Sequence, residues 1–313
     1  MKIFTDISQI EKKKVVLTIG TFDGLHLGHI DILKSVIQKS EEYSAESLAV
    51  TFEPHPRSVV SKDSKIKLLT TLDEKKEIFT ELGIENLLII NFTEEFASLS
   101  SREFIETYLL SKLNVSEIVV GYDHRFGKNR DGDESKLREI GNEFGFKVSS
   151  VSAVKVDDYT ISSTKIRNAL SLGDLKTANK YLGRFYCFYG DVIKGAGRGR
   201  KLGYPTANID PEKGDKLIPK PGVYLITSNI EGKDYFGLMN IGSRPTFNDI
   251  ENMLVEVHLL DFNDDIYGKH LRLDLIDRLR DEKKFASKDE LMIQIKNDEK
   301  KSNEIINLII NSG

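Results

Sequence analysis

The stretch that decides the fold is VVLTIGTFDGLHLGH, residues 15–29. Its first five residues are apolar or β-branched, as in a buried strand, and the next ten place glycines among polar side chains. After His29, apolar residues recur at helical spacing, at Ile30, Leu33, Val36 and Ile37. A strand that passes through a glycine-rich turn into a helix is the unit of a parallel α/β sheet, which binds ligands at the carboxyl ends of its strands. The stretch therefore predicts a fold and the place of a ligand site.

The same alternation continues through the first half of the chain. Short apolar runs, each too short for a typical helix, occur at Leu48–Phe52, Leu87–Phe92, Ile118–Val120 and Val148–Val151. Helical spacing recurs at Phe104, Ile105, Tyr108 and Leu109, and again at Leu137, Ile140 and Phe144. From about residue 164 to residue 182 the pattern predicts two short helices broken near Gly173–Asp174. We therefore expect an N-terminal α/β domain with a parallel sheet.

The second half has a different character. Glycine and proline are dense from residue 190 onward, and alternating strand patterns follow at Val223–Thr227, Leu254–Leu260 and Leu271–Ile276. No helical pattern separates these strands, which predicts an antiparallel sheet or small barrel. Residues 288–310 return to helical spacing. We place the boundary near Arg184, giving domains of residues 1–184 and 185–313.

Composition excludes several classes of protein. The 313 residues are 39% hydrophobic and 30% charged, as in soluble globular domains, and the length suits about two domains. A net charge of -4 gives no strong basic field, so we expect neither nucleic acid nor an anionic membrane as a partner. The single cysteine, Cys187, allows no intrachain disulfide, and no signal peptide or membrane-spanning run is evident. We expect a cytoplasmic protein.

The turn at residues 20–29 predicts a phosphate site. At a strand-to-helix turn, free backbone N–H groups and the helix dipole favour an anion, and glycines let the backbone approach it closely. His26 and His29 are three residues apart, so both imidazoles can donate to the same phosphoryl group. Two alternatives remain open at this point. The histidines can be ordinary polar residues at a helix start, or they can form a zinc site together with His55.

Three further polar segments fall at expected strand ends or at a helix start. Pro54-His55-Pro56 follows one strand, the segment from Gly121 to Gly127 (GYDHRFG) follows another, and ISSTKIR at residues 161–167 precedes the connector helices. In the last segment Ser163 and Thr164 can cap a helix beside the charges of Lys165 and Arg167. One site at this edge of the sheet would require such convergence.

GTFDGLHLGH together with ISSTKIR resembles the nucleotidylyltransferase superfamily, and the PHP and DHRFG segments are similar to the FMN adenylyltransferase module of bacterial bifunctional FAD synthetases. The resemblance implies a Rossmann-like domain in which His26, His29 and Arg167 act on the ATP phosphates and Asp123 helps to bind flavin. That family usually has Phe where this chain has His124. The residues that the resemblance assigns to nucleotide or phosphate binding here are Gly20, Phe22, Asp23, Gly24, Gly28, Ser163 and Thr164.

A second constellation lies at residues 190–209, which are rich in glycine and cations. Such a loop can wrap a polyphosphate, or it can be an exposed linker or a nucleic-acid contact of the Arg-Gly type. The loop is followed by Thr206 and Asn208, whose side chains offer the hard oxygen ligands that Mg²⁺ prefers. Downstream, Glu256 lies in an alternating strand, either as a general base facing a pocket or as a solvated carboxylate.

GRKLGYPTANI (199–209), PKPGVY (219–224), NIGSRPTF (240–247), VEVHLLDF (255–262) and residues 266–285 resemble riboflavin kinase. The resemblance implies a small Greek-key β-barrel with a helical tail, in which Thr206 and Asn208 hold Mg²⁺ with ATP and Glu256 removes the proton of the riboflavin 5′-hydroxyl. It places Arg278 near the flavin entrance. The residues that it assigns to a flap over the phosphates are Gly195, Gly197, Arg200 and Gly203.

Both resemblances together predict a bifunctional enzyme of flavin cofactor biosynthesis. The C-terminal module phosphorylates riboflavin to FMN, and the N-terminal module adenylylates FMN to FAD, with ATP as co-substrate and Mg²⁺ as cofactor in both steps. Two alternatives are kept. A nucleotidylyltransferase acting on a phosphopantetheine- or nicotinamide-type substrate leaves the second half unassigned. A flavin-binding carrier has no need of a proton acceptor such as Glu256.

Overall fold

The computed structural model describes residues 1–10, 12–61, 66–194, 204–211, 214–243 and 253–312. The chain divides into two compact units, Met1–Ser163 and Thr164–Gly313. Of the connector helices α7 (Ser163–Leu172) and α8 (Leu175–Leu182), all residues after Ser163 are thereby grouped with the second unit. The domain boundary near Arg184 stays a prediction.

The first unit contains a six-stranded, all-parallel sheet in the order β1-β4-β3-β2-β5-β6, as the strand–helix alternation predicts. The chain leaves β2 toward β3 on one side and reaches β5 on the other, so the switch point of the sheet lies between β2 and β5. The strands are β1 (Lys2–Phe4), β2 (Lys14–Ile19), β3 (Glu46–Glu53), β4 (Asn86–Asn91), β5 (Asn114–Gly121) and β6 (Lys147–Val151).

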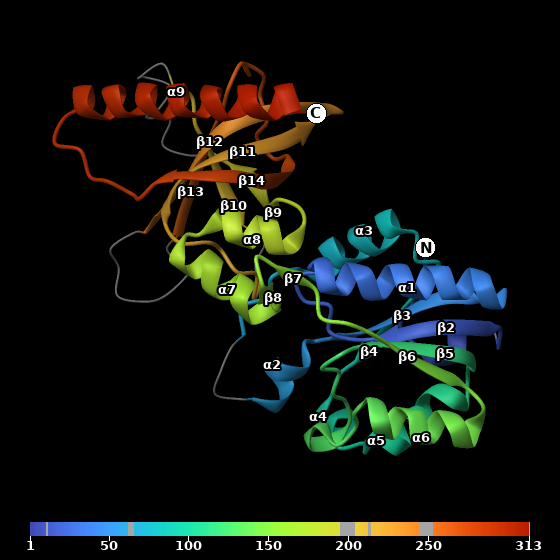
Figure 1. Cartoon of the computed structure of the whole chain (residues 1–313). Coiled ribbons are helices and arrows are strands. Elements are labelled where there is room, and N and C mark those ends of the chain that lie inside the picture. Colours follow the sequence, from blue (N-terminus) through green and yellow to red (C-terminus); the bar gives the residue numbers. More distant parts are fainter. Residues whose placement is uncertain (11, 62–65, 195–203, 212–213, 244–252, 313) are drawn as a thin grey trace. The chain divides into compact units, whose positions relative to one another are not determined.

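Helices cover both faces of this sheet (Figure 1). On one face, α1 (Leu27–Tyr43) and α3 (Leu72–Leu82) bury Leu33 and Phe79 against the strands. On the other face, the π-helical segment η2 (Phe104–Leu110) and α6 (Glu134–Phe144) contribute Phe104 and Leu137. The shorter elements are η1 (Ile7–Gln9), α2 (Pro56–Val60), α4 (Glu94–Ala97), α5 (Ser101–Glu103), η3 (Lys128–Arg130), β7 (Lys155–Val156) and β8 (Tyr159–Thr160).

Helix α3 and strand β1 are among the elements that the sequence patterns did not predict. Helix α3 begins with a capping box, in which Glu74 N donates to Thr71 Oγ1 and Glu74 Oε2 accepts from Thr71 N, and it ends at Gly83 in the left-handed region, with φ 87°. Strand β1 has three residues, too few for a periodic pattern. Phe79 of helix α3 packs against Phe22 in the turn that follows β2.

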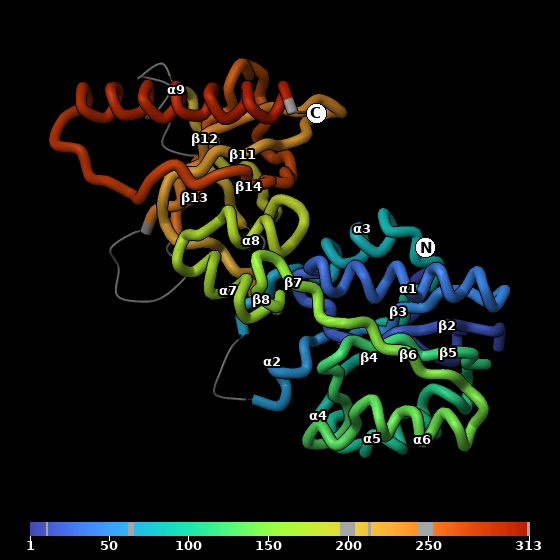
Figure 2. Tube along the Cα trace, in the orientation of Figure 1, coloured from blue at the N-terminus to red at the C-terminus, as the bar shows by residue number. Residues whose placement is uncertain are grey.

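The second unit is a closed six-stranded antiparallel barrel, in the order β10-β13-β12-β11-β14-β9, with a helical tail, which confirms the predicted barrel. The chain trace runs from α8 into β9 and ends in α9 (Figure 2). Asn179 of α8 joins that helix to the barrel by donating to Leu275 O (2.9 Å) and accepting from Tyr186 N (2.7 Å). The elements are β9 (Tyr186–Ile193), β10 (Ala207–Pro211), β11 (Gly222–Ile230), β12 (Lys233–Ser243), β13 (Met253–Leu259), β14 (His270–Arg280) and α9 (Lys288–Ser312).

Strand β13 shows the predicted alternation. Val255 and Val257 are fully buried, whereas Glu256 and His258 are half-buried on the opposite face. Leu238 of β12 lies opposite His258 and packs with Ile306 of α9. Helix α9 therefore covers part of the barrel face to which Glu256 belongs. Within the described residues, no helix is long and apolar enough to cross a bilayer.

Candidate active sites

The first site is the turn between β2 and α1. His26 is the N-cap of α1, and its Nδ1 accepts from His29 N at 3.4 Å. The two imidazole rings stack with centroids 3.8 Å apart and an interplanar angle of 13°. A side chain at Gly28 would meet the His26 ring at 3.3 Å, so glycine gives this ring its place. The pair thus lies at the positive end of a 17-residue helix, where an anion is stabilised.

The backbone of this turn is held in an unusual conformation. Phe22, Gly24 and Leu25 have φ angles of 47°, 88° and 41°. Residues with a side chain rarely occupy this left-handed region, and they stay there only where the surrounding structure holds them. Phe22 and Leu25 are both buried, and the Phe22 ring makes edge contacts with His29 and Phe79. Packing against α3 therefore helps to set the position of His29.

Asp23 connects this turn to two other segments. Its carboxylate is 1% exposed and accepts from Leu69 N (2.8 Å) and Thr70 N (3.1 Å), while Thr70 Oγ1 accepts from Gly24 N (3.0 Å). Its backbone carbonyl accepts from Ser163 Oγ at 2.8 Å. The structure thus brings Ser163 to the histidine turn, as the sequence predicts, and gives Asp23 a bracing contact that the sequence did not predict. Thr164 and Arg167 follow on α7, and the roles of all these residues in nucleotide binding stay predictions.

The segment between β5 and α6 lines an open pocket. The pocket has a volume of about 460 Å³ and is lined by Tyr122, Asp123, His124, Arg125, Arg130, Asp133, Glu134 and Ser135. His124 stacks on Phe126, and its Nε2 is inaccessible and finds no hydrogen-bond partner among the described residues. Burial lowers the pKa of His124 to about 4, with Asp123 opposing and Arg130 reinforcing the shift. His124 is therefore neutral at physiological pH.

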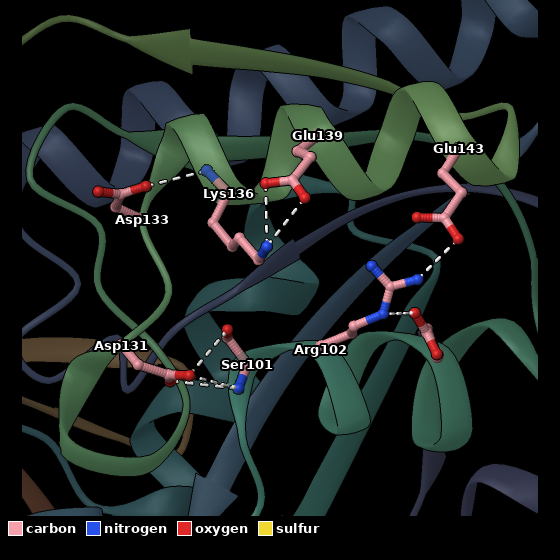
Figure 3. A network of polar contacts seen from close by, with 8 residues as sticks. Ser101, Arg102, Asp131, Asp133, Lys136, Glu139 and Glu143 are labelled. Atoms are coloured by element: carbon pink, nitrogen blue, oxygen red, sulfur yellow. Dashed lines mark hydrogen bonds and ion pairs between the residues drawn. The ribbon is translucent and has the colours of Figure 1, made fainter.

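Polar contacts hold the C-terminal part of this segment, just before α6, in place (Figure 3). Asp131 accepts from Ser101 N (3.2 Å) and Ser101 Oγ (3.1 Å), and Asp133 caps α6 by accepting from Lys136 N (2.9 Å). Arg102 bridges Glu106 and Glu143 nearby. Since Ser101 is buried, its two bonds fix the loop from residue 127 to residue 131 against α5.

The zinc alternative for the histidines gains no support. His55 lies at the start of α2, where its Nδ1 accepts from Arg57 N at 3.1 Å. In the part of the chain that the structure describes, no three His, Cys, Asp or Glu side chains are grouped so that they could hold a metal ion.

The second site lies on the barrel. Asn208 of β10 is the register partner of Glu256 on β13, and Glu256 is in turn the partner of Asn240 on β12. Side chains of directly opposed residues lie on the same face, with Cβ atoms about 5 Å apart. The structure therefore brings together Asn208 and Glu256, which were predicted from sequence, and adds Asn240. Asn240 stands in the NIGSRPTF stretch, but its alignment with Glu256 depends on a strand pairing that no local pattern shows.

A cluster of side chains fixes the backbone just before Thr206. His258 Nδ1 lies 2.8 Å from Pro205 O, and its ring packs edge-on against Tyr204. Tyr204 donates to Glu299 of α9 at 3.2 Å, and Glu299 lies 4.0 Å from His258 Nε2. Helix α9 and β13 thus hold the start of the Thr206–Asn208 segment together.

The remaining predicted residues have different outcomes. Gly195, Gly197, Arg200 and Gly203 lie outside the described residues. Arg278 is engaged within its unit, donating to Pro221 O (2.7 Å), Tyr224 Oη (3.3 Å) and Asp281 (2.7 Å). Its guanidinium also packs against Gly173 between α7 and α8. A role for Arg278 at a flavin entrance stays a prediction.

The two folds and their sites together define the class of protein as a two-module transferase that acts on nucleotides. A family model described as FAD synthetase matches residues 8–165, and one described as riboflavin kinase matches residues 182–306. The bifunctional riboflavin kinase/FMN adenylyltransferases of Escherichia coli K12 and Bacillus subtilis are 36% and 37% identical, over 97% and 93% of this chain and 96% and 92% of theirs. The chain belongs to the bifunctional riboflavin kinase/FMN adenylyltransferase family. The two activities predicted from sequence and their order along the chain are thereby confirmed.

The fold also has a solved counterpart. A crystal structure of a protein described as a macrolide-efflux protein from Streptococcus pneumoniae superposes with a TM-score of 0.88 and 31% identity, covering 96% of this chain and 98% of that chain. Two family models and the curated relatives agree on flavin chemistry, so the structural match adds support for the fold alone.

Proposed function

We propose that the N-terminal unit adenylylates FMN at the turn that carries His26 and His29. An oxygen of the FMN phosphate attacks the α-phosphorus of ATP in line, and the bond to pyrophosphate breaks. The imidazoles and the N-terminus of α1 stabilise charge on the phosphoryl oxygens, while Ser163, Thr164 and Arg167 close over the triphosphate. The attacking group is already anionic, so no general base is needed. The stacked histidines at a helix N-terminus are the observation that carries this proposal.

In the barrel, Glu256 is the general base of riboflavin phosphorylation. It takes the proton of the 5′-hydroxyl while the oxygen attacks the γ-phosphorus of ATP and the bond to ADP breaks. A base is needed because a neutral alcohol is a weak nucleophile. The position of Glu256 between Asn208 and Asn240 supports this role, since amides at both sides orient a carboxylate without neutralising it. Arg278 and the flap from Gly195 to Gly203 keep the roles that the family resemblance implies.

The barrel residues fit a magnesium ion. Thr206 and Asn208 lie two residues apart, and Asn208 is the register partner of Glu256. Thr206 offers a hydroxyl oxygen and Asn208 an amide oxygen, which are hard ligands that Mg²⁺ prefers. Thr206 and Asn208 would hold the ion, which when bound neutralises the ATP phosphates.

Separation of flavins by chromatography tests the proposal. The intact chain, incubated with riboflavin and Mg²⁺-ATP, should convert riboflavin to FMN and then FAD, with release of pyrophosphate. Retention of riboflavin without any product would instead support the flavin-carrier alternative. A chain that phosphorylates riboflavin but leaves FMN unchanged would refute the role of the histidine turn.

A further inference from the structure

One lysine is buried beneath the histidine turn. Lys75 of α3 is 1% exposed, whereas the next residue, Lys76, points outward and pairs with Asp73 at 2.7 Å. Lysine is rarely buried to this extent, because its ammonium group loses hydration. Burial accordingly lowers the pKa of Lys75, and the carboxylates of Asp23, Glu53 and Glu74 oppose that shift.

Among these three carboxylates, Asp23 belongs to the histidine turn itself. Glu74 is engaged in the capping box of α3, and Glu53 ends β3. Side chains of a helix lean toward its N-terminus, which here is the end that joins Leu69 and Thr70, the partners of Asp23. The ammonium group therefore supplies positive charge on the side of the Asp23 carboxylate.

The same face of α3 also contacts the residue before Asp23. Phe79 lies one helical turn after Lys75, and its ring packs edge-on against Phe22 with centroids 5.5 Å apart. Helix α3 thus interacts with two consecutive residues of the turn. The Phe79 ring packs against Phe22, and the charge of Lys75 acts on Asp23. Phe22 has a positive φ and contacts His29 directly, so the position of His29 depends on this support.

We propose that Lys75 is a positioning residue for adenylyl transfer, acting through Asp23 to hold the histidine turn in its strained conformation. Lys75 contacts neither the nucleotide nor the flavin in this role. The proposal rests on the proposed function of the N-terminal unit. The barrel supplies an internal control, because riboflavin phosphorylation in the same chain does not use this turn.

The test compares the intact wild-type chain with K75M, K76M, D23N and the double variant D23N/K75M. We expect K75M to lower kcat/KM for ATP in FMN adenylylation by about tenfold or more, as displacement of a catalytic group does, while riboflavin phosphorylation and K76M stay at wild-type values. Because Lys75 acts through Asp23, the double variant should be no slower than D23N.

Equal FAD formation by K75M and wild type, or losses that multiply in the double variant, would overturn the role of Lys75. A wild-type chain that makes no FAD from FMN would instead refute the proposed function. If K75M fails to fold, K75R decides the matter, because it keeps the charge. The proposal then requires K75R to adenylylate FMN within about threefold of wild type, and a folded but inactive K75R would contradict it.

Discussion

Asn208 and Glu256 lie directly opposite each other in the antiparallel pairing of β10 with β13. The pairing places an amide oxygen and a carboxylate side by side on one face of a barrel, although 47 residues separate them in sequence (256 − 208 − 1). A metal ligand and a general base need this proximity, because both act on the same ATP–alcohol pair.

Glu256→Gln should abolish FMN formation from riboflavin and leave FAD formation from supplied FMN unchanged. Glutamine keeps the size and hydrogen-bonding reach of glutamate but cannot accept the proton, and loss of a general base lowers kcat by about 100-fold or more. The matched control is Glu231→Gln, an exposed carboxylate of the same barrel that pairs with Lys269. An unaltered kinase rate in the Glu256 variant would remove this residue from the mechanism.

His258→Phe should slow riboflavin phosphorylation by roughly tenfold and raise the concentration of Mg²⁺ needed for half-maximal rate. Phenylalanine keeps the ring packed against Tyr204 but removes the nitrogen that holds Pro205 O, so the Thr206–Asn208 segment loses its anchor. His270→Phe is the control, since His270 forms an exposed pair with Asp191. If both variants titrate with Mg²⁺ alike, His258 does not position the segment.

His124→Phe should protect the first unit against acid. His124 has a pKa of about 4 in the folded chain and about 6.5 when unfolded, so the unfolded state binds more protons between these values. Folding stability contributed by neutral His124 is present above pH 6.5 and is lost as the pH falls toward 4. The variant should therefore gain up to about 3 kcal/mol over wild type at pH 4 and about nothing at pH 7.

Urea unfolding of the first unit at several pH values measures this gain. A constant difference between the wild-type and His124→Phe proteins at all pH values would show that His124 does not titrate with a lowered pKa.

A fragment of residues 164–313 should fold and phosphorylate riboflavin, and one of residues 185–313 should be less stable by about 2 kcal/mol or more. The shorter fragment lacks Asn179, which bonds Leu275 O and Tyr186 N, and Leu170, whose carbonyl accepts from Lys220 N. Denaturant unfolding followed by a kinase assay compares the two. Equal stability would show that the connector helices contribute nothing to the barrel and would favour the boundary near Arg184.

The sequence predicts the elements whose buried residues form a continuous apolar run or recur at a regular spacing. Strands such as Val15–Ile19 and Leu48–Phe52 are continuous apolar runs because a parallel sheet is buried on both faces. Helix α3 was not predicted from sequence because two of its buried residues, Glu74 and Lys75, are charged. Together with Phe79 they therefore form no apolar pattern. The sequence alone does not distinguish Lys75, which is buried, from Lys76, which is half-buried.

Site residues likewise divide into those that a local pattern predicts and those that it does not. His26 and His29 are predictable because three-residue spacing at a helix start places both on one side. The alignment of Asn240 with Glu256, and the bond of His258 to Pro205, depend instead on which strands pair when the barrel closes. Such long-range pairing is set by the packing of the whole unit.

The most direct test of two separate sites mixes two variants that are each blocked in one step. His29→Ala should make FMN but no FAD from riboflavin, and Glu256→Gln should make neither FMN nor FAD from it. Mixed in equal amounts with riboflavin and Mg²⁺-ATP, they should form FAD, because FMN released by one chain is adenylylated by the other. A mixture that yields no FAD, although the Glu256 variant adenylylates supplied FMN, would contradict release of FMN between two independent sites, and His29→Ala without kinase activity would contradict their separation.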